Sequence, residues 1–167
     1  MSGRAKPAAN ERFCPLSSLK LDPTQVLCPS AQPEMADAVV FGLVRGTVDE
    51  PRVFPLAKPQ PVTPELLALA APVRPTEVFR FAAPCAGTAC SHFDGAKCQL
   101  AGRFVKLLPP VTATLPPCHL RTNCRWWRQE GRAACLRCPQ LVTESEPKDE
   151  RFIEAAGGAM AQVRRES

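Results

Sequence analysis

The chain has no tyrosine among its 167 residues, and its large aromatic side chains are limited to 8 phenylalanines and 2 tryptophans. Burial of aromatic rings therefore contributes little to its core. No run of about 18 consecutive apolar residues occurs, which excludes a membrane-spanning helix. Residues 1–18 also lack the apolar core of a secretory signal peptide, so we expect a cytoplasmic protein without a membrane partner.

The motifs of common enzyme classes are missing as well. There is neither a Gly-x-x-x-x-Gly-Lys phosphate loop nor a Gly-x-Gly-x-x-Gly dinucleotide fingerprint. The 2 histidines, His92 and His119, stand beside cysteines in the sequence, but sequence neighbours seldom reach the geometry of a nucleophile and its base. We therefore expect a protein without catalytic residues.

Cysteine, in contrast, is abundant, and seven of the 9 cysteines fall between Cys85 and Cys138. In a cytoplasmic protein such thiols stay reduced, and an odd total leaves one unpaired, so disulfides are disfavoured. Small buried hydrophobic residues and bare redox thiols are the remaining alternatives. Metal binding explains the clustering best.

The later cysteines form a group of four. They read Cys118-x5-Cys124-x10-Cys135-x2-Cys138, and the Cys-x2-Cys turn places two sulfurs on one side of a tight loop. The same turn occurs in thiol–disulfide enzymes, but no βαβ pattern surrounds it here. A histidine does not follow it, which excludes covalent c-type haem attachment. These four thiols are sufficient for one metal site.

The earlier cysteines form an incomplete group. They read Cys85-x4-Cys90-x7-Cys98 and supply three ligands, so a fourth must come from elsewhere. Three residues are candidates for it: His92, Cys14 and Cys28. The predicted metal ligands are thus seven cysteines and one histidine: Cys85, Cys90, Cys98, Cys118, Cys124, Cys135, Cys138 and His92.

The spacing favours an iron–sulfur cluster over Zn²⁺. Both accept four thiolates, but structural zinc sites usually combine two short knuckles, and here a single Cys-x2-Cys is present. The wider gaps suit a larger group, and the Cys138-Pro139 step is like the end of bacterial ferredoxin motifs. Electron transfer, cluster delivery and sensing are the functions open to such a protein.

Arginines surround the later group. Between Cys118 and Cys138 there are five arginines and one acidic residue, Glu130. Four thiolates leave net negative charge on a bound metal, and guanidinium groups can offset that charge. A solvated basic surface is the alternative explanation. The arginines that we expect to contact the cofactor are Arg121, Arg125 and Arg137.

An interaction module stabilised by zinc is the alternative function. Trp126 and Trp127 lie among these arginines, and such a combination can stack on bases and neutralise phosphates. The alternative is that the tryptophans beside a metal site form the core of this part of the chain. The sequence pI of about 8.8 is low for a nucleic-acid-binding domain, and a protein partner is the other option.

The remaining pattern predicts an α+β fold of one small irregular domain, residues 12–143, between a disordered N-terminus, residues 1–11, and a charged flexible or frayed-helix tail, residues 144–167. The 19 prolines indicate short elements. We expect strands at Ala36–Val44, Arg52–Leu56 and Glu77–Phe81 and helices at Pro64–Ala71, capped by Thr63, and Leu100–Leu108.

Several stretches resemble a family of small bacterial proteins, frequent in cyanobacteria, that is loosely labelled "nitrogen fixation protein". The resemblance rests on Cys28-Pro-Ser-Ala, Glu77-Val-Phe-Arg-Phe-Ala-Ala-Pro-Cys85, His92-Phe-Asp-Gly and Cys124-Arg-Trp-Trp-Arg-Gln-Glu-Gly-Arg-Ala-Ala-Cys135, with Pro61-Val-Thr-Pro-Glu-Leu-Leu-Ala-Leu-Ala. It implies a bacterial cytoplasmic protein with a link to metal-cluster metabolism, and it supplies no ligand assignment.

Overall fold

The computed structural model describes residues 22, 24–47, 50–141 and 150–157. A four-stranded sheet and several short helices confirm the predicted α+β class. Cys14 and the predicted disordered N-terminus lie outside the described residues. No helix in the described part of the chain is long and apolar enough to cross a membrane.

The sheet is antiparallel throughout. Its strands are β1 (Leu27–Cys28), β2 (Val39–Gly46), β3 (Pro51–Pro61) and β4 (Phe79–Pro84), in the order β1-β4-β2-β3. β2 and β3 form a hairpin, as the two predicted strands required, although β3 continues farther than expected. β3 is an edge strand, which is where proline is tolerated. It contains four prolines: Pro51, Pro55, Pro59 and Pro61.

The prediction of a half-buried strand at Glu77–Phe81 was wrong in two respects. Glu77 belongs to a short helix, α2 (Pro75–Val78), and the strand starts two residues later. β4 is also buried on both faces, because it lies between β1 and β2 and is covered from either side. Even Arg80, a charged residue and the second residue of β4, is only 3% exposed.

The two faces of the sheet pack against different parts of the chain. Val40, Phe79 and Phe81 contribute to one apolar cluster, which the residues around helix α1 (Pro64–Ala68) cover. Thr63 caps α1 as predicted, since its Oγ1 accepts the Leu66 N–H at 3.2 Å. Side chains alternate across a strand, so Val39, Phe41 and Ala82 point to the other face. That face meets the cysteine-rich half of the protein.

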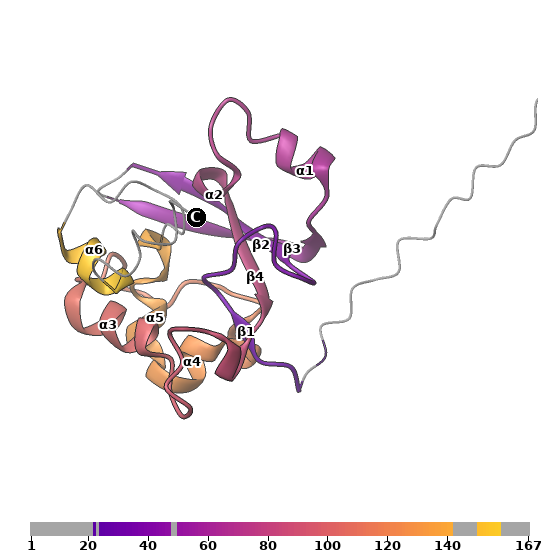
Figure 1. Ribbon diagram of the computed structural model, residues 1–167. Helices are drawn as coiled ribbons and strands as arrows, with labels where there is room; N and C mark the ends of the chain where they lie inside the picture. Colours follow the sequence, from indigo (N-terminus) through magenta and orange to yellow (C-terminus); the bar gives the residue numbers. More distant parts are fainter. Residues whose placement is uncertain (1–21, 23, 48–49, 142–149, 158–167) are drawn as a thin grey trace, which may run out of the picture.

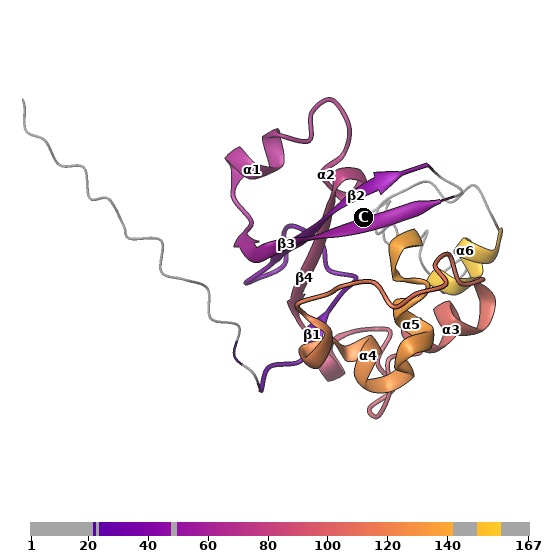
Figure 2. The same ribbon diagram turned by 180° about the vertical axis from the view of Figure 1, so that it is seen from behind.

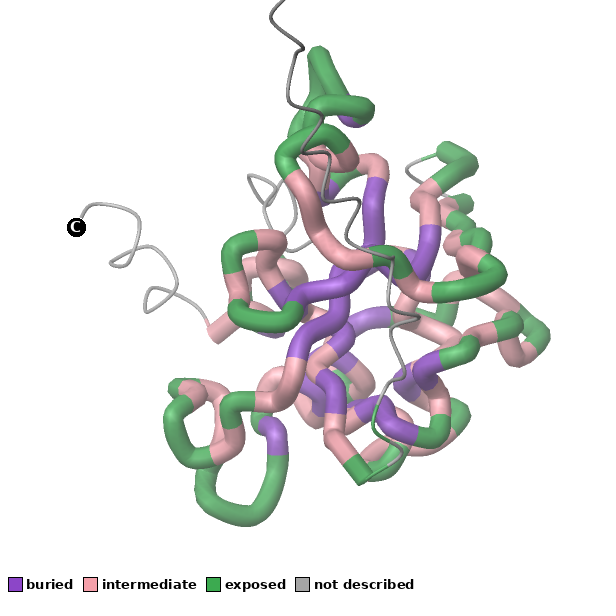
Figure 3. Tube along the Cα trace, turned by 90° about the vertical axis from the view of Figure 1, so that its right-hand side faces the viewer, coloured by how far each residue is buried: buried purple, intermediate pink, exposed green. Residues whose placement is uncertain are grey.

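The cysteine-rich half is helical and has its own core. Its helices are α3 (Gln99–Leu107), α4 (Arg125–Glu130), α5 (Arg132–Cys135) and α6 (Glu150–Ala156). They lie together on the side of the sheet away from α1, and buried chain runs from the sheet into them (Figures 1, 2 and 3). The Phe104 and Trp126 rings pack at 4.9 Å in the centre. Three 3₁₀ turns complete the half: η1 (Gly87–Ala89), η2 (Arg121–Asn123) and η3 (Cys138–Gln140).

Candidate metal centre

Strand pairing brings Cys28 beside Cys85. Cys28 is the last residue of β1 and pairs with Ala83 of β4, while Cys85 directly follows β4. The Cys85 N–H donates to the Val26 carbonyl at 2.8 Å, which continues the ladder by one step. Two cysteines far apart in the sequence therefore stand on neighbouring strands.

The chain then turns back to add Cys90 and Cys98. The Phe93 N–H donates to the Cys90 carbonyl at 3.0 Å, and Phe93 forms a single antiparallel bridge with Cys98, the residue before α3. Electrostatic repulsion from the thiols of Cys85, Cys98 and Cys90 raises the pKa of Cys28. The thiols of Cys90 and Cys85 raise the pKa of Cys98 in the same way. We call these four residues the first cysteine group: Cys28, Cys85, Cys90 and Cys98.

The four later cysteines also come together. Cys118 precedes η2, Cys124 stands between η2 and α4, Cys135 ends α5, and Cys138 begins η3. The thiols of Cys124, Cys118 and Cys135 all raise the pKa of Cys138 by electrostatic repulsion, so the short helices bring these residues into one region. We call Cys118, Cys124, Cys135 and Cys138 the second cysteine group.

Burial controls the protonation of these thiols. Desolvation raises the pKa of Cys28 to about 12 and that of Cys138 to about 12, and the neighbouring thiols add to both shifts. Burial likewise raises the pKa of Cys124 to about 11. Without a bound cation these three cysteines are therefore neutral thiols at pH 7. A metal must displace their protons to bind them.

Backbone N–H groups offset part of this cost. Hydrogen bonds from Leu100 and Ala101 lower the pKa of Cys98, against the larger effect of burial, and those from Trp127 and Trp126 do the same for Cys124. In each case the donors are two and three residues after the cysteine. Neither sulfur makes a full helix-cap hydrogen bond as a thiol, but the donors already point at the position where a thiolate would form.

The thiols are neighbours without being closed around a point. Among the residues that the structure describes, no three histidine, cysteine, aspartate or glutamate side chains are arranged to hold a metal ion as they stand. Each of the eight described cysteines is a free thiol. The groups are therefore defined by the mutual electrostatic effects of their thiols and by the backbone pairing.

Buried N–H donors without an acceptor indicate whether a metal ion or cluster with its sulfur ligands would fit near the cysteines. Four such donors have no acceptor in the described part of the chain: Arg80 Nε, Arg121 Nε, Arg125 Nε and Trp126 Nε1. Arg80 lowers the pKa of Cys138, and Arg121 lowers the pKa of Cys118, both in the second group. Arg125 and Trp126 directly follow Cys124 in the sequence. Unpaired buried donors are rare in native proteins. Thiolates and the sulfides of an iron–sulfur cluster accept N–H bonds, so these donors fit an anionic, sulfur-rich group.

The predicted arginines have different roles in the structure. Arg121 favours the Cys118 thiolate and stacks on the Trp127 ring, with its Cζ 5.3 Å from the ring centroid. Arg125 extends toward the first group, where its Cζ lies 5.0 Å from the centroid of the Phe93 ring. Arg137 is engaged with the backbone, since it donates to the Leu108 carbonyl at 2.6 Å and to the Ala133 carbonyl at 2.9 Å.

His92 was one of three candidates for the fourth ligand of the first group. Its Nδ1 lies 3.3 Å from Nη2 of Arg103 on α3, and its carbonyl accepts the Gln99 N–H at 2.7 Å. Of the other two candidates, Cys28 lies with the three thiols, and Cys14 is outside the described residues. The structure thus brings Cys28 to the place where the sequence lacked a ligand.

The two groups are directly connected through the backbone. Leu27, the residue before Cys28, forms a parallel bridge with Cys124. The buried Asn123 donates to the carbonyls of Asp22 and Gln25, at 2.9 Å and 2.8 Å, and so holds the segment before β1. Adjacent strands lie about 5 Å apart, so the backbones of the two groups are in contact at this point.

Gln129 on α4 adds a second connection. Its Oε1 accepts the Cys98 N–H at 2.7 Å, and its Nε2 donates to the Cys98 carbonyl at 3.0 Å. Both polar groups of a first-group cysteine are thereby held by a side chain from the helix that follows Cys124. Residue type gave no signal of this role in the sequence, because glutamine is common on exposed helix faces.

The alternative of a nucleic-acid module loses one of its two tryptophans. Trp126 is only 1% exposed and packs on Phe104, so its ring is part of the core and is not available to stack on a base. Trp127 is partly exposed beside Arg121. An interaction surface here would therefore depend on Trp127 and the arginines.

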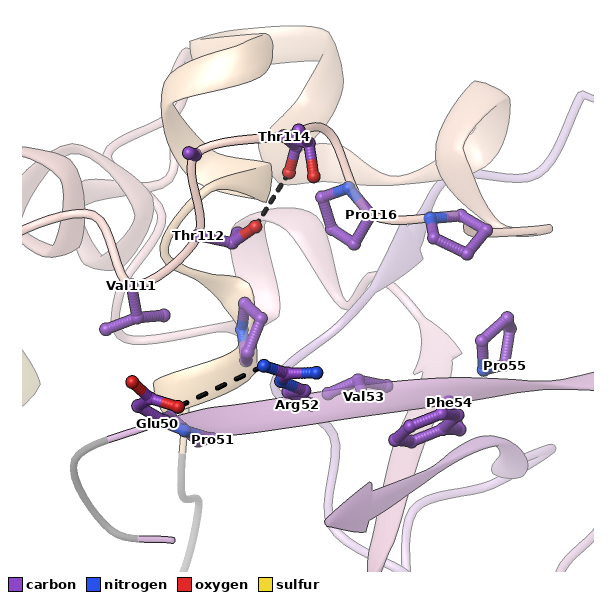
Figure 4. A pocket seen from close by; sticks show the side chains of 13 residues that line it. Glu50, Pro51, Arg52, Val53, Phe54, Pro55, Val111, Thr112, Thr114 and Pro116 are labelled. Carbon is purple, nitrogen blue, oxygen red and sulfur yellow. Dashed lines mark hydrogen bonds and ion pairs between the residues drawn. The ribbon is translucent and has the colours of Figure 1, made fainter. Parts of the chain in front are cut away.

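A separate cavity of about 540 Å³ lies between β3 and residues 111–117 (Figure 4). Figure 4 shows the Arg52 and Glu50 side chains at one end, where their charged groups lie 4.0 Å apart. Prolines from both segments line the rest of it. No cysteine lines this cavity.

Comparisons with family models, with curated proteins and with solved structures found no match to this chain.

Proposed function

We propose that this protein is a metalloprotein with one metal centre in each cysteine group, an iron–sulfur cluster being the preferred occupant and Zn²⁺ the alternative. One observation carries the proposal: the eight described cysteines fall into two sets of four, and in each set three thiols lie close enough to the fourth to raise its pKa. Four thiolates are the ligand number of structural zinc and of the common iron–sulfur clusters. Buried small hydrophobic residues would have no reason to gather in fours.

The surroundings of the thiols support a cluster over a single ion. The unpaired N–H donors of Arg80, Arg121, Arg125 and Trp126 require acceptors, and a cluster has sulfides in addition to the thiolates. Hydrogen bonds to the sulfurs and burial are also the means by which proteins adjust cluster potentials. Electron transfer, cluster delivery or sensing would follow from two adjacent centres of this kind. The resemblance of several stretches to the proteins labelled "nitrogen fixation protein" would link such a role to nitrogen or metal-cluster metabolism.

Metal analysis of the full chain, purified under anaerobic conditions, tests the proposal. We expect iron and acid-labile sulfide in amounts that correspond to two centres per chain, with the charge-transfer absorption of thiolate-bound iron. Colourless protein with two zinc ions per chain would mean that both metal centres exist and that they hold Zn²⁺ in place of iron–sulfur clusters. Fully folded protein that has no metal under either condition would refute the proposal.

A matched pair of variants separates the centres. Cys98→Ser removes a ligand from the first group and Cys135→Ser one from the second, and each should reduce the metal content by one centre. Ser17→Ala lies far from either group in the sequence and serves as a control for handling losses. If either cysteine variant lost both centres, the two groups would have to be parts of one site.

A further inference from the structure

A buried arginine that has no carboxylate partner among the described residues lies between the sheet and the second cysteine group. Arg80 is 3% exposed and is the second residue of β4, a strand whose other residues are apolar. Phe79 and Phe81 point to the opposite face of the sheet, so the Arg80 side chain extends toward the cysteine-rich half. Arginine is almost never fully buried unless it is paired.

The contacts of Arg80 leave its charge uncompensated. Nη2 donates to the carbonyls of Cys138 and Pro139, at 2.9 Å and 2.8 Å. Both acceptors are neutral, and Nε has no acceptor in the described part of the chain. The ion pair found among these residues joins Arg52 and Glu50 at the surface and does not involve Arg80. In the described part of the chain, the side chain that acts electrostatically on this buried cation is the Cys138 thiol, which becomes an anion when it loses its proton.

The second cysteine group is the source of such an anion. Four thiolates around a divalent ion, or around a cluster core of charge +2, give a complex with a net charge of about −2. Arg80 is held against the η3 backbone at Cys138, one of the four ligands. In the first group, by contrast, the electrostatic contributions to the pKa values of Cys28 and Cys98 come from other thiols, which raise them.

We propose that Arg80 is the counter-charge and positioning residue of the centre in the second group, and that it makes this centre more firmly held than the centre in the first group. The inference rests on the proposed function and assigns a residue of the sheet to the regulation of one centre. It also explains why a charged residue is placed in the most buried strand. The guanidinium lowers the free energy of the loaded, anionic form and holds the Cys138 turn by its carbonyls.

Release of metal from the loaded full-length protein tests the assignment. The variants are Arg80→Met, which removes the charge, and Arg80→Lys, which keeps it but changes the bonds to the carbonyls. Arg132→Met is the matched control, because Arg132 is exposed and donates to the Ala113 carbonyl at 2.9 Å. A chelator in excess is added, and the release from each group is assigned with the Cys98→Ser and Cys135→Ser variants.

We expect Arg80→Met to release the second centre at least tenfold faster and to leave the first centre within twofold of the wild type. Arg80→Lys should restore most of the retention, and Arg132→Met should have no effect. If the centre is a cluster, its reduction potential should become more negative in Arg80→Met and stay close to the wild-type value in Arg80→Lys.

Two outcomes would overturn the assignment. Equal acceleration at both groups in Arg80→Met, or equal losses in Arg80→Met and Arg80→Lys, would mean that Arg80 acts only through its bonds to the backbone. Failure of the proposed function is distinguishable from either, because wild-type protein would then have no metal to release.

Discussion

The first and second cysteine groups each consist of four cysteines, but the chain assembles them differently. The second group lies within one segment, Cys118–Cys138, folded by short helices and turns. The first draws Cys28 from β1 and its other thiols from the residues after β4. A local segment can gather its four thiols before the sheet exists, whereas the first group needs β1 paired with β4. Folding of the sheet is therefore a condition for the first group and less so for the second.

Charge is the other difference between the two groups. Two arginines lower the pKa values of thiols in the second group: Arg80 from the sheet lowers that of Cys138, and Arg121 from η2 lowers that of Cys118. At Cys28 the electrostatic contributions to the pKa come from the other cysteines of its group, and they raise it. Identical ligand sets can thus have different affinities and potentials, because the groups behind the ligands differ. Four variants test this comparison, from the largest expected effect to the smallest.

Cys28→Ser should have the largest effect, because it removes the ligand that the sheet contributes. We expect the first centre to be lost completely and the second to remain, so that metal content falls by half. His92→Ala is the matched variant and should retain both centres. Metal analysis after anaerobic purification measures both. Loss of metal in His92→Ala with full retention in Cys28→Ser would transfer the fourth ligand to the histidine.

Trp126→Ala should weaken both groups together. The ring lies between α4, which follows Cys124, and Phe104 of α3, the helix that follows Cys98. Removing a buried tryptophan costs about 3–5 kcal/mol, which urea unfolding of the loaded protein would measure. Trp127→Ala, at a partly exposed position, should cost about 1 kcal/mol. Similar costs for the two would mean that Trp126 is not at the core of this half.

Gln129→Leu should disturb the first group from a helix of the second. The variant leaves the Cys98 N–H without its acceptor and removes one of the two donors to the Cys98 carbonyl, which keeps the Gly102 N–H, at a cost of about 1–3 kcal/mol in unfolding free energy. Release of the first centre to a chelator should become faster, with the second unchanged. The control is Gln140→Leu, whose side chain donates to the Pro109 carbonyl at an exposed position. A selective effect on the second centre would contradict the connection that we describe.

Thr63→Ala should have the smallest effect and none on metal. It removes the N-cap of α1, which lies on the far side of the sheet from both groups, at a cost of about 1 kcal/mol. Thermal unfolding would detect the loss, and Thr63→Ser should restore it. A change in metal content in Thr63→Ala would show that the two sides of the sheet are coupled.

The elements that could be predicted from sequence are those defined by local signals. Thr63-Pro64 is a cap followed by proline, and Leu100–Leu108 has the apolar spacing of a helix, so both were found. The four cysteines of the second group could also be placed together from the sequence, because they share one segment; that they bind a metal stays a prediction. The position of Cys28 was left open among three candidates, since β1 has only two residues and no periodicity can be read from it.

Arg80 was misjudged, and Trp126 was left between two interpretations, for a related reason. An alternation of apolar and charged residues indicates a strand with one wet face, but β4 is central and Arg80 points into the protein. For Trp126 the sequence allowed a stacking surface or a core position, and its ring is buried on Phe104. In both cases tertiary packing decides the exposure of a side chain, and neighbouring residues do not reveal it.

The prolines of β3 have a consequence for self-association. An exposed edge strand offers backbone donors and acceptors to any other extended chain, and this is a common route to aggregation. Proline has no N–H to donate, so β3 cannot present a continuous ladder to a second copy of the sheet. Replacing Pro55 and Pro59 with threonine would remove that protection, and light scattering of concentrated protein should then detect larger assemblies than it does for the natural sequence.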